Sequence, residues 1–227
     1  MKIRIRFSKQ GQMKFIGHLD MVRYFQKVMR RAEIDVAYSE GFSPHQKMSF
    51  AAPLSVGVLS QGEYFDLEVK STYSSKESMK RINQQNVEGV EVLSYKLLPE
   101  HAKNAMSIVA AADYMIYTDI FSKSDIDRFI RQNEIYVIKK TKKSEKEVNI
   151  RPLIYEMKRR GDGIFIKLAQ GSVQNLKPEL VIDALSRFTG VNISAPIVYE
   201  RLDMYCMENE RLVSLDDIGQ NIGGTLG

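Results

Sequence analysis

The chain has 227 residues, 44% of them hydrophobic, which is enough to bury the core of one large domain or two small ones. Lysine and arginine number 33 against 28 acidic residues, and the formal charge of +5 permits an anionic partner without requiring one. The single cysteine, Cys206, excludes an intramolecular disulfide framework and a cysteine-ligated zinc or iron–sulfur site, and it fits a reducing compartment.

The first residues alternate between apolar and basic side chains, with Ile3, Ile5 and Phe7 on one face, which predicts a half-buried strand and not a signal peptide. No apolar run reaches the roughly 18–20 residues that span a bilayer, so we expect a cytoplasmic protein without membrane association. An amphipathic helix is predicted next, at 19–32. Later elements of this half are strands at 47–51, 62–69 and 90–97 and a helix at 75–85.

The second half repeats this pattern after a linker at 99–107. Strands are predicted at 111–118, 135–139, 147–154, 164–168 and 197–205, and helices at 124–132 and 178–188. The order strand, helix, strand, strand, helix, strand is typical of a ferredoxin-like unit. We therefore predict an α+β protein of two tandem ferredoxin-like (βαββαβ) units with antiparallel sheets. The units are residues 1–98 and 108–206, followed by a loose C-terminal tail at 207–227.

The connection between the first helix and the second strand contains the densest group of special residues in the chain. Gly41 accepts a positive φ without steric cost, and Pro44 fixes its own φ, so a rigid non-helical turn is predicted here. Such a turn would present Phe42, His45 and Lys47 to a nucleotide or to a protein partner. The alternative is a tight turn with ordinary polar decoration.

Two of the three histidines and one carboxylate are candidates for chemistry. His18 and Asp20 lie at the start of the first helix, and His45 lies in the loop that follows it. If segment 33–46 folds back over the sheet, the three side chains could meet and bind a metal or transfer protons. Alternatively, His18 satisfies the helix end and His45 packs within its loop. The spacing fixes no ligand set, so we predict no metal and no cofactor.

Basic side chains gather in two segments. The first helix has no acidic residue between Asp20 and Glu33, and its cations form an outer stripe. Residues 139–151 hold six basic residues against two acidic ones, and together with 158–160 they would form one positive rim if the segments lie on neighbouring hairpin ends. The alternative for the second segment is a solubilising hairpin tip. The candidate phosphate contacts are Arg23, Lys27, Arg30, Lys139, Lys140, Lys142 and Lys143.

Several motifs of the first 70 residues resemble the radical-SAM-linked family, a bacterial domain of unknown function. They are Lys14-Phe-Ile-Gly-His-Leu-Asp-Met-Val-Arg23, Gly41-Phe-Ser-Pro-His-Gln-Lys47, Pro53-Leu-Ser-Val-Gly57 and Gly62-Glu-Tyr-Phe-Asp66. The resemblance continues more weakly through 149–153 and 171–180. The family's loop commonly reads Phe-Asn-Pro-His-Pro-Lys, and this chain departs from it at Ser43 and Gln46.

The resemblance implies a partner, because members of this family are encoded beside, or fused to, a radical S-adenosylmethionine protein. That enzyme needs three closely spaced cysteines for its cluster, and this chain has one. Together with the family's position near ribonuclease and ribosomal-protein genes, the resemblance implies a non-catalytic accessory protein that presents tRNA or rRNA to the radical-SAM partner. The alternatives are a metal-independent RNA-processing enzyme using His18 and His45, and a protein–protein scaffold that binds no nucleic acid.

Overall fold

The computed structural model describes residues 1–140 and 145–227. Its first half consists of β1 (Lys2–Lys9), α1 (His18–Arg31), β2 (Met48–Phe50), β3 (Leu59–Glu68), α2 (Ser75–Asn83) and β4 (Val90–Leu97), with a 3-10 turn at Gly11–Phe15. Strand β1 pairs antiparallel with β3 and β4, and β2 pairs antiparallel with β3. The strand order is therefore β4-β1-β3-β2, and each element predicted in this half is present within a few residues of its predicted bounds.

The second half repeats this order and adds a hairpin. Its elements are β5 (Val109–Tyr117), α4 (Lys123–Ile130), the hairpin β6 (Tyr136–Lys140) and β7 (Glu145–Asn149), β8 (Ile154–Arg160), β9 (Gly163–Ala169), α5 (Pro178–Thr189) and β10 (Val198–Glu208). The strand order is β10-β5-β9-β8, all antiparallel. The single strand predicted at 147–154 is wrong. A 3-10 turn at Arg151–Leu153 separates β7 from β8, because Pro152 has no N–H to donate to a strand ladder.

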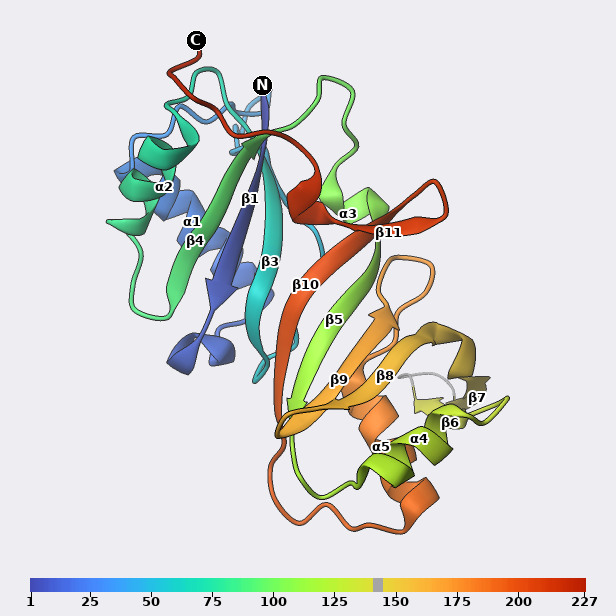
Figure 1. The fold of residues 1–227 in the computed structure, drawn as a ribbon. Coiled ribbons are helices and arrows are strands. Elements are labelled where there is room, and N and C mark those ends of the chain that lie inside the picture. The colour runs from blue at the N-terminus through green and yellow to red at the C-terminus, as the bar shows by residue number, and fades with distance from the viewer. Residues whose placement is uncertain (141–144) are drawn as a thin grey trace.

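The two halves share one sheet in the order β4-β1-β3-β10-β5-β9-β8 (Figure 1). They join where β10 pairs in parallel with the first residues of β3. Strand β2 pairs with the last residues of β3, on the same side of that strand. The close approach requires Gly62, because a Cβ there would lie 2.4 Å from the carbonyl oxygen of Leu202. The predicted α+β class is confirmed, and one mostly antiparallel sheet replaces the two separate sheets that we predicted.

Helices α1, α2, α4 and α5 all cover one face of this sheet. Ile5 and Phe7 pack beneath the first pair, and Ile116 and Ile166 beneath the second, so each half has its own buried cluster. The apolar stripe of each helix explains its position, because burying that stripe stabilises a helix more than its intrinsic propensity does. Within the parts of the chain described above, none of the helices combines the length and apolar character that crossing a bilayer requires.

The opposite face is covered only in part, by α3 (Ala105–Ile108), β11 (Arg211–Ser214) and the 3-10 turn Leu215–Asp217. The Asp66 carboxylate receives 2.8 and 3.0 Å hydrogen bonds from Arg4 and a 2.7 Å bond from the backbone N–H of Ala105, which holds α3 against β3. Asp216 forms ion pairs with Arg6 and Lys96 of β1 and β4. Figure 1 shows α3 and β11 beside the same end of β10 and β5.

The prediction of a loose tail at 207–227 is wrong. Strand β10 continues to Glu208 and forms a hairpin with β11. Farther on, backbone bridges join Gln220 to Leu97 and Leu226 to Thr72. These pairings hold the last residues against the first half, although the local composition is acidic and rich in glycine. The bridges join positions more than 100 residues apart, a partnership that no local pattern in the sequence reveals.

Candidate nucleic-acid interface

The connection between α1 and β2 is a closed turn. The Ser39 N–H donates to the His45 carbonyl oxygen at 2.9 Å, and the Lys47 N–H donates to the Ala37 carbonyl oxygen at 2.9 Å. The Ser39 hydroxyl accepts from the His45 N–H at 3.1 Å and lies 2.8 Å from His45 Nδ1. Gly41 has φ +103, a conformation that L-residues rarely adopt. The predicted non-helical turn is therefore confirmed, and its rigidity stays a prediction.

Phe42 lies at the tip of this turn, and its side chain is fully exposed, at a relative exposure of 111%. Leaving a phenylalanine in water forgoes about 1.5–3 kcal/mol of burial free energy. A single exposed apolar residue is common on protein surfaces. Here, however, four hydrogen bonds close the base of the turn that carries Phe42 at its tip. The ring therefore projects into solvent from the tip of a turn that is closed at its base.

Gln46 joins this turn to α1. Its buried side chain donates from Nε2 to the Gln26 carbonyl oxygen at 3.1 Å and to the Tyr38 hydroxyl at 3.4 Å. Gln26 directly precedes Lys27, so the turn packs along one side of the basic stripe of α1. We define this stripe as Arg23, Lys27 and Arg30. Its members lie at spacings of four and three residues, and all three are exposed.

Few acidic groups neutralise the stripe. Arg23 forms an ion pair with Asp20 at 3.2 Å, but the two side chains are 70% and 66% exposed. Pairs this exposed contribute little free energy, because water screens both charges. The stripe therefore presents cationic groups on the helix that the turn with Phe42 contacts, and cations near an exposed aromatic ring are typical of surfaces that bind single-stranded nucleic acid.

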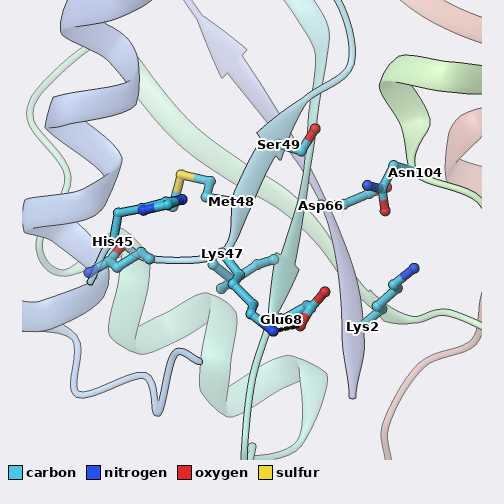
Figure 2. Close-up of a pocket in the computed structure, with 10 residues that line it drawn as sticks. Lys2, His45, Lys47, Met48, Ser49, Asp66, Glu68 and Asn104 are labelled. Carbon is cyan, nitrogen blue, oxygen red and sulfur yellow. Dashed lines mark ion pairs between the residues drawn. The ribbon is translucent and has the colours of Figure 1, made fainter. Parts of the chain in front are cut away.

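A cavity of about 180 Å³ lies at the base of the turn (Figure 2). Lys47 and Glu68 form an ion pair of 3.2 Å on one side of it, and Lys2 and Asn104 lie on the other. Because Asp66 is already bound by Arg4 and α3, it adds no free carboxylate. Lys47, a predicted contact residue, is half-exposed and paired, so it contributes less net charge than the stripe does.

The three candidate catalytic side chains do not converge. The His18 ring packs edge-on against Phe50, with 5.5 Å between ring centroids, and Asp20 faces Arg23. His45 directly precedes Gln46, whose side chain donates to the Gln26 carbonyl oxygen. Gln26 lies eight residues, or about 12 Å, farther along α1 than His18. In residues 1–140 and 145–227, no three histidine, cysteine or acidic side chains are grouped so that they could hold a metal ion.

The second basic segment is placed differently from our prediction. Lys139 donates to the Asn175 carbonyl oxygen at 3.0 Å, just beyond the end of β9. Arg160 instead pairs with Gly163 at the beginning of β9. The six residue steps of that strand put about 20 Å between the two positions, so the single positive rim that we predicted is wrong. Lys140 is the last residue of β6, and the predicted contacts Lys142 and Lys143 lie outside the described residues.

A buried charge cluster at the seam between the halves escaped the sequence analysis. Arg201 and Glu63 form a buried ion pair, and the buried Lys9 ammonium donates to the Ile16 carbonyl oxygen at 2.6 Å. Burial lowers the pKa of Lys9, against the opposing effect of the Glu63 charge. The sequence did contain a signal for this cluster, because Glu63 lies two residues before Phe65 and therefore on the same, core-facing side of the strand.

Fold and site together define a mixed α+β protein with a cationic helix beside an exposed aromatic turn. The chain belongs to the family described as an uncharacterized protein conserved in bacteria (DUF2344), which matches residues 2–178. This match confirms the predicted bacterial domain of unknown function, and the link to a radical-SAM protein stays a prediction.

Among curated proteins, none matches the chain. One similar solved structure is a chain of a "Cbf5-Nop10-Gar1 Complex", with 12% sequence identity and a TM-score of 0.44. The similarity covers 95% of this chain and 53% of that chain, so this protein spans about half the length of its structural neighbour. A likeness at this level carries no functional argument.

Proposed function

We propose that this protein is a non-catalytic accessory protein that binds RNA, of the tRNA or rRNA class, and presents it to a radical-SAM enzyme. The observation that carries the RNA part is the position of Phe42, fully exposed on a closed turn that packs beside the stripe of α1. An unpaired base would stack on the Phe42 ring, and the phosphates on either side would contact the stripe.

The dimensions of the site favour a short single strand. The stripe extends over seven residue steps of α1, or about 10 Å along the helix axis, which is enough for a few phosphates. Stacking on Phe42 requires a base that is not already stacked within a duplex, so loops and ends of a folded RNA are the fitting targets. Phe42 and the stripe can bind RNA by stacking and charge alone, without a chemical reaction. This favours a role in presenting RNA over a role in cleaving it.

The partner follows from the resemblance of the sequence motifs and from the cysteine count. An iron–sulfur cluster of the radical-SAM kind needs three cysteine ligands, and this chain has only Cys206. That thiol is buried, and burial raises its pKa, so it is a poor ligand and a poor nucleophile. In our proposal the cluster and the chemistry therefore belong to the partner, and this chain supplies the RNA.

The repeated strand order fits the same proposal. We interpret β4-β1-β3-β2 and β10-β5-β9-β8 as two ferredoxin-like units that merged into one sheet, with the hairpin β6–β7 inserted into the second. Each unit then offers one helical face and one sheet face, and the turn with Phe42 is an elaboration of the first unit between its helix and its short second strand.

The test is crosslinking and sequencing of RNA bound to the protein in its own cells. Lys27→Glu/Arg30→Glu alters the stripe, and Lys123→Glu/Arg187→Glu is the matched control on exposed helical positions of the second half. A defined tRNA or rRNA segment that the stripe variant loses and the control retains supports the proposal. No enrichment over background rejects RNA binding. Co-purification of the radical-SAM protein without RNA then identifies a scaffold.

A further inference from the structure

The sheet face of the second half offers a second surface. Along β5, Tyr114 and Ile116 point into the core beneath α4 and α5, so Asp113, Met115 and Tyr117 lie on the opposite face. Elements α3 and β11 cover that face near the beginning of β5, whereas Tyr117 lies at the other end of the strand (Figure 1). Tyr117 is 45% exposed there.

Hydrogen bonds within the protein orient the Tyr117 side chain. Its hydroxyl donates to Glu200 Oε2 at 2.5 Å, and the Gln10 and Gln61 side-chain amides each donate to Glu200 Oε1 at 2.9 Å. Glu200 is itself buried, so the acceptor cannot swing away. An exposed ring that is held by its far end loses little conformational entropy when a flat ligand stacks on it.

A second ring lies diagonally across the neighbouring strand. Tyr117 pairs with Gly163, and Met115 pairs with Phe165, so the two aromatic side chains are diagonal neighbours, roughly 7 Å apart. Phe165 is only 6% exposed, because Lys158 and Arg160 lie over its ring, at 5.3 and 5.8 Å from the centroid. Both cations extend from the edge strand β8, and Lys158 is 57% exposed and pairs with Glu156, so a base reaches the Phe165 ring only when the two cations move aside.

The exposed charges of this face gather at its edge, on β8 and the turn that follows it. Lys158 and Arg160 are exposed, Glu156 pairs with Lys158 at 2.5 Å, and a second exposed acid, Asp162, follows Arg160 in the turn between β8 and β9. Three further carboxylates of this face, Asp113, Asp203 and Glu200, each accept a hydrogen bond from a tyrosine hydroxyl, and Asp113 and Glu200 are buried. The aromatic rings of this face suit stacking with bases, and the cations at its edge suit contact with phosphates.

We infer that the face formed by Tyr117, Met115, Phe165, Lys158 and Arg160 binds a single-stranded RNA segment, with bases stacked on the rings and phosphates held by the two cations. This inference rests on the proposed function for its ligand class, but it concerns a surface separate from the Phe42 turn. A duplex does not fit, because its bases are stacked on one another and cannot lie on the rings.

The experiment uses the full chain and a 12-nucleotide oligouridine that carries photoreactive 4-thiouridine, with a 12-base-pair RNA duplex as competitor. We expect crosslinked peptides that contain Tyr117 or Phe165, and we expect the duplex to compete poorly. Lys158→Glu/Arg160→Glu should weaken binding by at least about fivefold, and Lys123→Glu/Arg187→Glu on the helical face by less than about twofold. Tyr117→Phe should retain the crosslink, and Tyr117→Ala should lose it.

The outcomes separate the two proposals. Crosslinks confined to the Phe42 turn, with unchanged affinity of Lys158→Glu/Arg160→Glu, overturn the sheet-face inference and leave the proposed function intact. Crosslinks at Tyr117 that survive Lys27→Glu/Arg30→Glu support the sheet face and reject the turn as the main site. If wild-type protein binds neither oligouridine nor duplex, both are rejected. A thermal midpoint within a few degrees of wild type shows that each variant is folded.

Discussion

Arg201 of β10 and Glu63 of β3 form a two-point ion pair across the seam between the halves. Arg201 Nε and Nη2 donate to the two Glu63 carboxylate oxygens at 2.8 and 3.1 Å, and the side chains are 1% and 5% exposed. Burial disfavours the charge of Arg201, yet Glu63 holds the pKa of the guanidinium above its usual value. Each charge is removed from water, so each depends on the other.

Removing one partner of this pair should destabilise the whole protein. Glu63→Gln leaves Arg201 and the nearby Lys9 without a compensating charge, and we expect the free energy of unfolding in urea to fall by about 3–5 kcal/mol. Glu63→Leu/Arg201→Met should recover much of that loss. Glu77→Gln is the control, because Glu77 pairs with Arg81 on an exposed helix face and should cost at most about 1 kcal/mol. Equal losses in both single variants would contradict this account.

The turn that presents Phe42 should depend on Gly41. A Cβ at Gly41 would meet nothing within 4 Å, so Gly41→Ala tests the backbone at φ +103 alone. We expect about 1–2 kcal/mol of strain, expressed as a misplaced turn and weaker RNA binding. Gly17→Ala is the control, because Gly17 is equally unobstructed and has φ −73. Electrophoretic mobility shifts with a labelled RNA oligonucleotide measure the binding. Identical affinities of the two variants would exclude a role for the turn conformation.

Phe42 should affect binding without affecting stability. The ring contributes no buried area, so Phe42→Ala should leave the thermal midpoint unchanged. Loss of one stacked base should reduce RNA affinity by about 1–3 kcal/mol, and Phe42→Tyr should preserve it. Fluorescence anisotropy with a short single-stranded RNA measures the affinity. An unchanged affinity of Phe42→Ala would remove the observation on which the proposed function rests.

The stripe of α1 should set the salt dependence of binding. Replacing Arg23, Lys27 and Arg30 by glutamine removes three phosphate contacts, each worth about 0.7 in the slope of log K against log salt for a single strand. We expect the slope to become shallower by about 2 units. Titrations at four salt concentrations measure it. A reduced affinity with an unchanged slope would show that the stripe acts through structure and not through phosphates.

Tyr117 should make the protein sensitive to alkaline pH. Its hydrogen bond to Glu200, and secondarily burial, raise the pKa of Tyr117 to about 12, above the value near 10 of an unfolded tyrosine. The folded chain therefore holds this proton more tightly, and the resulting stability is present below pH 10 and lost as the pH rises toward 12. In urea unfolding, the stability advantage of wild type over Tyr117→Phe should shrink across this range. A constant difference would contradict the assigned hydrogen bond.

Local periodicity predicted most of the secondary structure, because alternation and helical spacing depend on neighbouring residues. Strand β8 was not predicted, because a bulge between Ile154 and Glu156 breaks its alternation and because Lys158-Arg-Arg160 was assigned to a hairpin end. The turn at Gly41 was predicted correctly, because the local residues Gly41 and Pro44 determine it. The parallel pairing of β10 with β3 joins residues about 140 positions apart, and no local pattern encodes such a partner.

The candidate site was predicted in part. The stripe and the turn are local features, and Gln46 brings them together as a nucleic-acid interface requires. The meeting of His18 with His45 depended on how far the connecting segment folds back, which hydrogen bonds between Ser39 and His45 determine. Tyr117 was not considered, because its exposure follows from where α3 and β11 end on the sheet.

The shared edge of β3 has a consequence for dissecting this protein. A cut within 99–107 looks like a clean separation in the sequence, yet it would strip β10 from Leu59 and Ser60 and leave Glu63 without Arg201. Each fragment would then carry an unpaired strand edge and a buried charge with no counterion. Unpaired edges form hydrogen bonds with strands of other chains. Pieces cut at this linker should therefore aggregate on expression, and the proposed surfaces are best tested in the undivided chain.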